Sequence, residues 1–255
     1  MILESAKALV SGGASGLGQA VAKRITNAGG HVAILDVNAD HGEAVAAELG
    51  KRAVFVKTDV SNEQQIDAAV ATANERFGGI TLAVSCAGIL GAGRVLGRDG
   101  PMPAEQFTKV IHVNLIGAFL LAKAAALTMS DNPENPDGER GVIIQTASIA
   151  AFEGQIGQAA YSASKGGVVG MTLPLAREFA RLGIRVITIA PGIFQTPMMD
   201  GMPEHVQESL GAQVPFPSRL GRPDEFAQLV ASIYSNPMIN GTTIRLDGAI
   251  RMQPK

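Results

Sequence analysis

The sequence is poor in the residues on which several classes of protein depend. Cys86 is its only cysteine, which excludes an internal disulfide framework and a multi-cysteine metal site and favours a reducing compartment. The histidines, at positions 31, 41, 112 and 205, follow no ligand spacing. We therefore expect no catalytic metal.

Charge of either sign is also sparse. Charged residues make up 17% of the chain, the formal net charge is -2 and the pI is about 6.1. No run of lysine and arginine marks a basic patch, so nucleic acid and anionic lipid are not expected partners. The first ten residues lack the layout of a signal or transit peptide. The longest apolar stretch, from Ile116 to Met129, contains Lys123 and is shorter than the ~20 residues that span a bilayer. We expect a cytoplasmic protein outside the membrane.

Apolar residues, in contrast, are plentiful and regularly placed. They make up 46% of 255 residues, enough for one large core, and we expect a single domain over residues 1–255. Short β-branched runs alternate with longer helical patterns. The seven expected strands are Ala8 to Val10, His31 to Asp36, Ala53 to Lys57, Leu82 to Ser85, Val142 to Thr146, Arg185 to Ala190 and Thr242 to Leu246. The six expected helices are Gly16 to Ala28, Ala39 to Leu49, Glu63 to Phe77, Ala104 to Met129, Ala159 to Leu182 and Pro223 to Tyr234.

This alternation predicts an α/β protein whose parallel sheet is covered by helices on both faces. Two long segments, residues 88–103 and 195–221, follow expected strands. In open α/β sheets the loops beyond the carboxyl ends of strands line the ligand crevice. Both segments are therefore candidate substrate loops.

A glycine-rich turn, Ser11 to Gly18, joins the first expected strand to the first helix. Glycines let the backbone approach a pyrophosphate at the positive end of a helix, where free N–H groups point at it. The residues predicted to bind a dinucleotide here are Gly12, Ser15, Gly16, Leu17 and Gly18. An ordinary turn whose glycines serve packing alone is the alternative.

Acidic residues follow the next two strands. Asp36 lies where dinucleotide-binding folds place a carboxylate against the adenosine ribose, and it would repel the extra phosphate of NADP. Val37 follows, with no arginine or lysine beside it, so NAD is favoured over NADP. Asp59 and Val60 are placed to meet the adenine. Either aspartate could instead cap a helix, Asp59 the one that starts near Asn62.

Tyr161 and Lys165 are four residues apart, so they share one helical face, and Ser148 follows the fifth strand. Bringing a phenol from a pKa of ~10 to ~7 needs about 4 kcal/mol, and an ammonium at roughly 4 Å in a medium of effective dielectric ~20 supplies about that much. Tyr161 is thus a candidate acid/base, with Ser148 holding the same substrate oxygen. Alone, the Tyr-Lys spacing would more often mark an ordinary surface helix.

With the glycine turn, Asp36, Ser148, Tyr161 and Lys165 in this order, the chain resembles the short-chain dehydrogenase/reductase family over essentially its whole length. The resemblance implies a single Rossmann domain with a doubly wound seven-stranded sheet in the order 3-2-1-4-5-6-7, and it implies an NAD cofactor. It adds Asn114 as a fourth catalytic residue, where a polar helix kink is the alternative. It also adds cofactor contacts from Cys86, Ala87, Gly88, Pro191, Gly192, Phe194 and Thr196, besides Tyr161 and Lys165.

The family usually has asparagine where this chain has Cys86, which we expect to act through its backbone and not as a nucleophile. Longer stretches, from Ser148 to Tyr161 and from Ile244 to Pro254 among others, are similar to the branch of the family that oxidises L-3-hydroxyacyl-CoA to 3-ketoacyl-CoA in fatty acid metabolism. That resemblance implies a homotetramer. A hydroxysteroid or other secondary-alcohol dehydrogenase is the nearest alternative, and a non-catalytic NAD-binding protein is a remote one.

Overall fold

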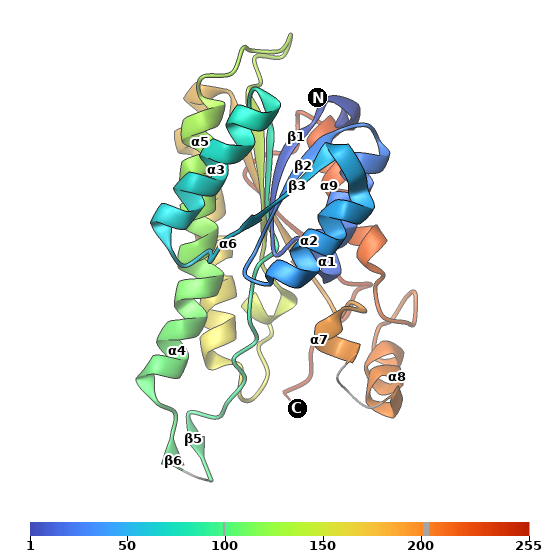
Figure 1. Ribbon diagram of the computed structural model, residues 1–255. Coiled ribbons are helices and arrows are strands. Elements are labelled where there is room, and N and C mark those ends of the chain that lie inside the picture. The colour runs from blue at the N-terminus through green and yellow to red at the C-terminus, as the bar shows by residue number, and fades with distance from the viewer. Residues whose placement is uncertain (99, 201–203, 255) are drawn as a thin grey trace.

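A computed structural model describes residues 1–98, 100–200 and 204–254 of the chain (Figure 1). Seven strands form one parallel sheet in the order β3-β2-β1-β4-β7-β8-β9. Their bounds are Lys7–Ser11 (β1), His31–Asp36 (β2), Ala53–Lys57 (β3), Leu82–Ser85 (β4), Gly141–Thr146 (β7), Ile184–Pro191 (β8) and Thr243–Leu246 (β9). Counted along this sheet alone, the order is the predicted 3-2-1-4-5-6-7. The single doubly wound α/β domain is confirmed.

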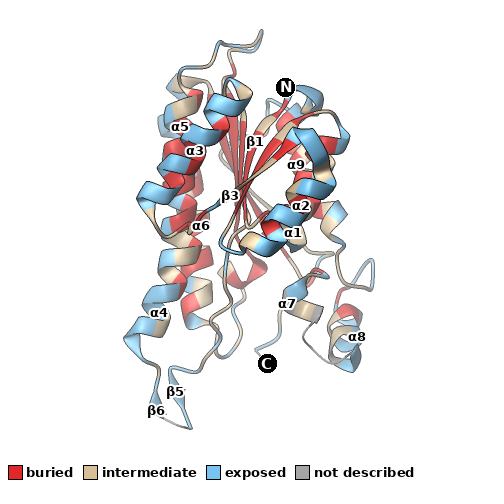
Figure 2. Cartoon of the chain, in the orientation of Figure 1, coloured by how far each residue is buried: buried red, intermediate tan, exposed pale blue. Residues whose placement is uncertain are grey.

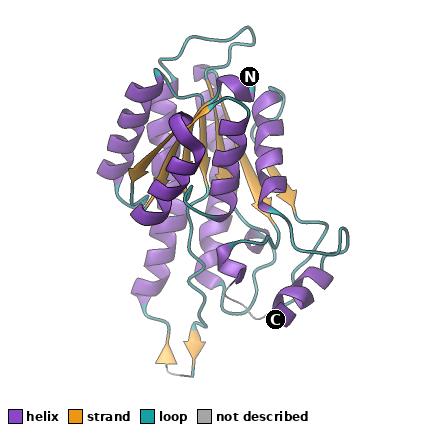
Figure 3. Ribbon diagram, turned by 45° about the vertical axis from the view of Figure 1, so that its right-hand side comes forward, coloured by secondary structure: helices purple, strands orange, loops and turns teal. Residues whose placement is uncertain are grey.

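Helices cover both faces of the sheet (Figures 1 and 3). One face carries α1 (Gly16–Asn27), α2 (Ala39–Leu49) and α9 (Pro223–Ser235), and the other carries α3 (Glu63–Phe77), α4 (Ala104–Ile111), α5 (Gly117–Met129) and α6 (Ala159–Phe179). Successive residues of a strand point to opposite faces. Thus Ala8 and Val10 pack with α1 and α9, whereas Leu9 between them packs with α3 and α5. The central strands are therefore buried on both faces, whereas the edge strands β3 and β9 are only partly buried (Figure 2).

The helix predicted from Ala104 to Met129 contains a π-helical turn, His112–Ile116, between α4 and α5. At this turn the N–H of Gly117 bonds to the carbonyl of His112, five residues earlier. Taken together, the 26 residues form the one described helix that is long and apolar enough to cross a membrane, yet 56% of its most apolar window is buried inside the protein. Such burial is typical of a core helix.

Both predicted substrate loops contain secondary structure that the sequence pattern did not show. The first forms a hairpin of two short strands, β5 (Leu96–Gly97) and β6 (Gly100–Pro101), which projects from the body of the protein beside α4 (Figure 1). The second contains α7 (Pro197–Asp200) and α8 (Glu204–Ala212). Parts of the two loops, at position 99 and positions 201–203, lie outside the described residues.

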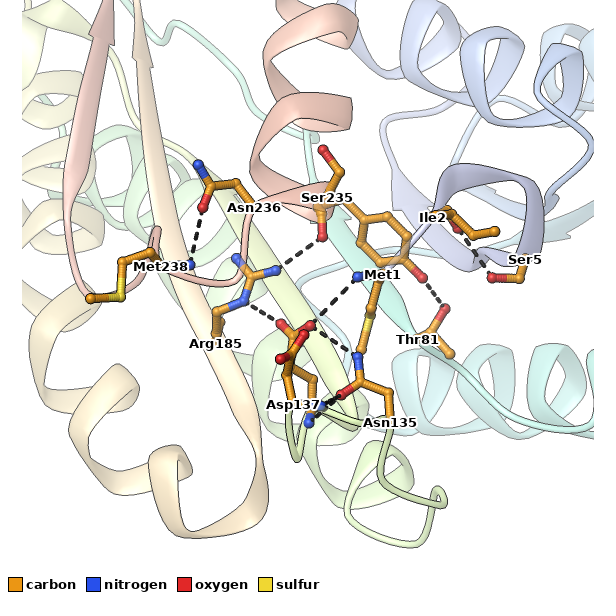
Figure 4. Close-up of polar contacts among 12 residues, drawn as sticks. Met1, Ile2, Ser5, Thr81, Asn135, Asp137, Arg185, Ser235, Asn236 and Met238 are labelled. Atoms are coloured by element: carbon orange, nitrogen blue, oxygen red, sulfur yellow. Dashed lines mark hydrogen bonds and ion pairs between the residues drawn. The ribbon is translucent and has the colours of Figure 1, made fainter.

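A buried ion pair lies at the end of the sheet where the strands begin (Figure 4). Arg185, in β8, donates to Glu139 over 2.6 Å, and only 6% and 7% of the two side chains is exposed. The Nη1 and Nη2 groups of Arg185 donate to the carbonyls of Ile233 and Tyr234, in the last turn of α9, and of Ile239, just beyond it. The segment from Ser130 to Gly141 thus supplies a buried carboxylate that joins β8 to α9.

Candidate active site

A cleft of about 700 Å³ opens at the carboxyl ends of the strands. It brings together residues from the turn after β1 and from the segments that follow β2, β3, β4, β7 and β8. Every residue predicted to bind a cofactor lines it, namely Gly12, Ser15, Gly16, Leu17, Gly18, Asp36, Asp59, Val60, Cys86, Ala87, Gly88, Tyr161, Lys165, Pro191, Gly192, Phe194 and Thr196. Ser148 lines it as well, whereas Asn114 does not. Segments far apart in the sequence therefore share one wall.

The glycine turn adopts a backbone that other residues rarely reach. Gly12 and Gly16 have φ of +65° and +52°, in the left-handed region that glycine enters at little cost. A Cβ on Gly12 would lie 2.7 Å from the backbone nitrogen of Ala87, and one on Gly18 would lie 2.2 Å from the carbonyl oxygen of Gly12. Helix α1 begins at Gly16, and no side chain caps it among the described residues. Its first N–H groups are therefore available to an anion such as a pyrophosphate.

Asp36 joins the end of β2 to the glycine turn. Its carboxylate accepts hydrogen bonds from the backbone N–H of Ala14, over 3.1 Å, and of Asn38, over 3.0 Å. Asn38 is the N-cap of α2, because its side chain accepts from the N–H of His41. The helix-cap alternative for Asp36 is therefore wrong. The carboxylate is held at the cleft by two backbone donors.

Asp59 is not a helix cap either. The N-cap of α3 is Asn62, whose side chain accepts from the N–H of Gln65 over 3.0 Å. The carboxylate of Asp59 instead accepts from the backbone N–H and the hydroxyl of Ser61, over 2.9 and 2.7 Å. Val60 beside it is 6% exposed. The two residues form the wall of the cleft after β3.

The three polar residues predicted for catalysis lie together. Ser148 follows β7, and its hydroxyl oxygen accepts from the N–H of Ala150 over 3.1 Å. The Ser148 side chain is also hydrogen-bonded to Tyr161. Lys165 lies one helical turn further along α6, with its Nζ 5.8 Å from the centre of the Tyr161 ring and donating to the carbonyl of Thr146 over 2.8 Å. A substrate oxygen placed between Ser148 and Tyr161 would meet both hydroxyls.

Burial has the largest effect on the pKa values of Lys165 and Tyr161. It lowers the pKa of Lys165 to about 8, because a charged ammonium is poorly solvated there. Burial also raises the pKa of Tyr161, and the hydrogen bond with Ser148 offsets only part of that rise. The direction for Tyr161 is opposite to the sequence prediction. That prediction relied on the charge of Lys165, whereas the Lys165 ammonium donates to the Thr146 carbonyl and burial has the largest effect on the pKa of Tyr161.

Cys86 lies against this polar group with a protonated thiol. Burial raises its pKa to about 12, although the Thr146 hydroxyl and the charge of Lys165 act in the opposite direction. The Thr146 hydroxyl donates to Sγ over 3.8 Å. A thiol with this pKa is a poor nucleophile, since the thiolate is the reactive form. The protonation state agrees with our reading of Cys86 as non-nucleophilic.

Asn114 lies behind the cleft wall, in the π-helical turn. Its side chain accepts from the N–H of Ile89 over 2.8 Å and donates to the Ile89 carbonyl over 2.9 Å. The second amide N–H donates to the hydroxyl of Ser164 over 3.1 Å. A Cβ on Gly88 would lie 3.2 Å from the Asn114 side-chain oxygen and 3.6 Å from Nζ of Lys165. Asn114 thus holds the segment after β4 against α6.

The segment after β8 completes the cleft beside α1. Gly192 lies so close to Asp247 that a Cβ on the glycine would be 2.9 Å from the Asp247 backbone. Phe194 forms an isolated parallel bridge with Gly221 and is 7% exposed. Thr196 approaches the glycine turn, since a Cβ on Gly16 would lie 3.5 Å from its side chain. Residues at both ends of the predicted loop 195–221 are thereby held at the cleft.

Several lining residues were not predicted from the sequence. They include Ile89 and Leu90 after β4, Gln155 and Gln158 before Tyr161, and Met252 near the C-terminus. Among the described residues of the loop 88–103, only Gly88 to Leu90 line the cleft. The buried Ser164 was also missed. Its place immediately before Lys165 was a usable signal, whereas nothing local in the sequence placed Met252 in the cleft.

Comparison with known proteins agrees with this geometry. The family described as short chain dehydrogenase matches residues 6–207. The chain belongs to the short-chain dehydrogenase/reductase family and is an oxidoreductase that acts on CH–OH groups with a nicotinamide cofactor. No three His, Cys, Asp or Glu side chains of the described part of the chain gather to form a metal site.

Its relatives are more specific. The chain is 53% identical over 249 residues to 3-hydroxyacyl-CoA dehydrogenase type-2 of Bos taurus, which covers 97% of this chain and 95% of the relative. It is 49% identical over 255 residues to the protein of that name from Drosophila melanogaster, covering 99% of this chain and 100% of the relative. The crystal structure of 3-hydroxyacyl-CoA dehydrogenase type-2 from Mycobacterium avium superposes with a TM-score of 0.93 at 45% identity, covering 99% of this chain and 98% of that one.

Proposed function

We propose that this enzyme is an NAD-dependent 3-hydroxyacyl-CoA dehydrogenase that reversibly oxidises L-3-hydroxyacyl-CoA to 3-ketoacyl-CoA. The observation that carries the chemistry is that Ser148, Tyr161 and Lys165 line the same cleft as the glycine turn. The names of the similar proteins support the substrate class. The same site on a hydroxysteroid or another secondary alcohol is the second candidate.

NAD is the proposed cofactor. The glycine turn presents the start of α1 to the pyrophosphate, and the Asp36 carboxylate is held where it would accept from ribose hydroxyls. An additional phosphate on that ribose would meet the negative charge of Asp36, and the neighbouring Val37 offers no cation. Asp59 and Val60 would contact the adenine. The residues after β4 and β8 would contact the nicotinamide end.

Tyr161 is the proposed acid/base. A nicotinamide bound in this cleft would supply the hydride acceptor for the carbinol carbon, and its positive charge would lower the pKa of Tyr161. The phenol oxygen of Tyr161 takes the proton of the substrate hydroxyl and returns it in the reverse direction. Ser148 donates a hydrogen bond that holds the same oxygen. Lys165 would orient the nicotinamide ribose, while Asn114 holds the surrounding backbone and would anchor a water of the proton relay.

The substrate is proposed to lie between the segments 88–103 and 195–221. Leu90 comes from the first, and Met199 and Leu210 come from the second. All three are apolar, which suits an acyl chain or a steroid.

Assembly and location are further parts of the proposal. We propose a homotetramer, because apolar side chains are exposed on α5 and α6, among them Phe119 at 43%, Leu127 at 75% and Leu173 at 42%. We also propose a cytoplasmic enzyme of fatty acid metabolism that is not embedded in a membrane. Sedimentation velocity on the purified protein would test the assembly, and a monomer at micromolar concentration would contradict it.

A cofactor assay tests the function. The purified enzyme is given acetoacetyl-CoA with NADH or NADPH and is compared on a panel of ketosteroids. We expect turnover of acetoacetyl-CoA with strong preference for NADH. Turnover of ketosteroids alone would replace the proposed substrate, and NADH binding without turnover of any ketone would mean a non-catalytic binding protein.

A further inference from the structure

The C-terminal segment, residues 248–254, lies against the candidate active site. It follows β9 at the carboxyl end of the sheet, where Figure 1 places the C-terminus beside α7 and α8. The connecting segment, residues 149–158, joins Ser148 to Tyr161. Contacts between these two segments therefore bear directly on the substrate end of the cleft.

Two hydrogen bonds join the C-terminal segment to the connecting segment. The side-chain amide of Gln155 donates to the carbonyl of Gln253 over 3.0 Å. The backbone N–H of Ile156 donates to the carbonyl of Pro254, also over 3.0 Å. Gln155 is itself part of the cleft wall. Gln253 and Pro254 are thus bonded to the connecting segment.

A charged clamp centred on Arg245 holds the same two segments together, since Arg245 also donates to the carbonyl of Ile250 over 3.1 Å. Arg245, in β9, donates to both carboxylate oxygens of Glu153 over 2.7 and 2.8 Å and to Asp247 over 2.7 Å. Its guanidinium also lies 5.3 Å from the centre of the Phe152 ring. The Arg245 hydrogen bonds lower the pKa of Glu153, so the carboxylate is charged at neutral pH. A two-point pair of this kind fixes orientation as well as distance.

A turn after β9 directs the chain back toward the cleft. Gly248 has φ of +58°, and Ala249 has φ of +68°, a conformation that is uncommon for a residue with a side chain. The carboxylate of Asp247 accepts from the N–H of Ala249 over 3.0 Å and stabilises the turn. As a result, Ile250 is buried with 1% exposed, and Met252 reaches the cleft. Strain of this type persists where surrounding contacts determine it.

An apolar cluster lies behind the catalytic serine. Ile149, Val214 and Ile250 form it, each no more than 5% exposed, and Ile193 and Met252 pack against it. Ile149 immediately follows the catalytic serine, and Val214 comes from the loop 195–221. The cluster therefore connects the C-terminal segment to both sides of the substrate end.

Met252 is the member of the C-terminal segment that lines the cleft together with Ser148 and Tyr161. Met199 and Leu210 line the same cleft. Unlike them, it belongs to a segment bound by two hydrogen bonds, the charged clamp and the apolar cluster. Its side chain is thus an apolar part of the cleft wall that packs against the cluster containing Ile149, the residue next to Ser148.

We infer that Met252 is a specificity-determining residue, which forms the wall against which the aliphatic chain of the substrate packs. The choice of acyl-CoA substrates in the test rests on the proposed function. The contact of Met252 with an alkyl chain would apply to any secondary alcohol that carries one. A shorter side chain leaves a gap beside a short chain and gives room to a long one. Selectivity for chain length should therefore change while cofactor binding does not.

The test compares Met252→Ala with Met252→Leu and with Met238→Ala as the matched control. Met238 is 91% exposed beyond α9 and does not line the cleft. For each variant, kcat/KM is measured with NADH for acetoacetyl-CoA and for 3-ketodecanoyl-CoA, and the NADH dissociation constant is measured by fluorescence. We expect the long-to-short ratio of kcat/KM to change by at least about fivefold in Met252→Ala, since a methylene in a hydrophobic pocket is worth roughly 10- to 200-fold. NADH affinity, and the ratio in both other variants, should stay within about twofold.

An unchanged ratio in Met252→Ala would overturn the inference. If that variant does not fold, Met252→Gln keeps the side-chain volume but adds a polar end, and it should selectively lower kcat/KM for the long substrate. A wild-type enzyme that reduces neither acyl-CoA refutes the proposed function instead. In that event the long-to-short ratio of kcat/KM is measured on aliphatic ketones that the enzyme does reduce. A ratio that is the same in Met252→Ala and wild type then overturns the inference that Met252 contacts the substrate chain.

Discussion

The amide of Asn114 donates to the hydroxyl of Ser164 over 3.1 Å, and that hydroxyl donates to the carbonyl of Tyr161 over 2.7 Å. Ser164 is fully buried and Asn114 is 1% exposed. The relay joins the π-helical turn to the first turn of α6, which carries the tyrosine. A buried hydroxyl thereby sets the position of the helix that holds the proposed acid/base.

Ser164→Ala should weaken this positioning. It leaves one amide N–H of Asn114 without its partner, at a cost of about 1–3 kcal/mol in the free energy of unfolding, and kcat should fall more than NADH affinity. Ser162→Ala is the matched control, because the Ser162 hydroxyl is buried with no hydrogen-bond partner among the described residues. Urea unfolding and steady-state kinetics would check both variants. Equal behaviour of the two would contradict a positioning role for Ser164.

Tyr161→Phe should abolish turnover and leave cofactor binding nearly intact. Loss of an acid/base group removes roughly 10²- to 10⁴-fold of rate, whereas the ring that borders the cleft is kept. Tyr234→Phe is the control, because that hydroxyl is bonded to Thr81 over 2.8 Å, away from the cleft. It should lose about 1 kcal/mol of stability and retain activity. Activity in Tyr161→Phe would refute the proposed mechanism.

Asp36→Asn should shift cofactor preference toward NADPH. Asparagine removes the charge and keeps one of the two side-chain oxygens, so it accepts from Ala14 or from Asn38 but not from both. Hydrogen bonds to charged groups are worth about 1.5–3 kcal/mol, so the NADH to NADPH ratio of kcat/KM should fall roughly 10- to 100-fold. Asp40→Asn, an exposed carboxylate on α2, serves as the control. A ratio that is the same in wild type and Asp36→Asn would remove Asp36 from cofactor selection.

Arg185→Met should be strongly destabilising. It leaves the N-terminal ammonium of Met1, 3.6 Å away, as the remaining cation beside the buried Glu139, and it removes donors to three carbonyls. Breaking a buried pair in this way costs about 3–5 kcal/mol. Glu139→Gln should cost less, because Arg185 retains its backbone partners. The exposed Arg181→Met provides the baseline. The midpoints of urea unfolding would rank the stabilities of the three variants. A larger decrease of the midpoint for Glu139→Gln than for Arg185→Met would contradict the argument.

The Glu225 carboxylate should make stability depend on acid pH. The Arg219 hydrogen bonds, followed by the backbone N–H of Arg222, lower its pKa from 4.5 to about 2. Since the pKa is lowered on folding, the stabilisation is complete above pH 4.5 and is lost as the pH falls toward 2. Glu225→Gln should therefore cost about 1 kcal/mol at pH 7, a value suited to a partly exposed pair. The difference from wild type should narrow below pH 4.5, whereas the exposed Glu75→Gln should show little change at any pH.

Much of the fold and the cofactor side of the cleft could be predicted because their signals are local. The alternation of short and long apolar periods defines the strands and helices, and right-handed crossovers then limit the sheet order. The glycine turn requires a backbone that glycine adopts readily. The spacing of Tyr161 and Lys165 places them on one helical face wherever that helix lies.

The tertiary structure alone decided the relations between distant segments. Asn114 and Ser164 are separated by 50 positions, and Arg245 and Glu153 by 92, so no periodic pattern connects them. The protonation of the catalytic group also depends on packing, because burial sets the pKa of Lys165 to about 8 and the direction for Tyr161. The sequence by itself determined which residues could do the chemistry. The folded structure decided what surrounds them, because desolvation and long-range hydrogen bonds exist only once separate elements pack together.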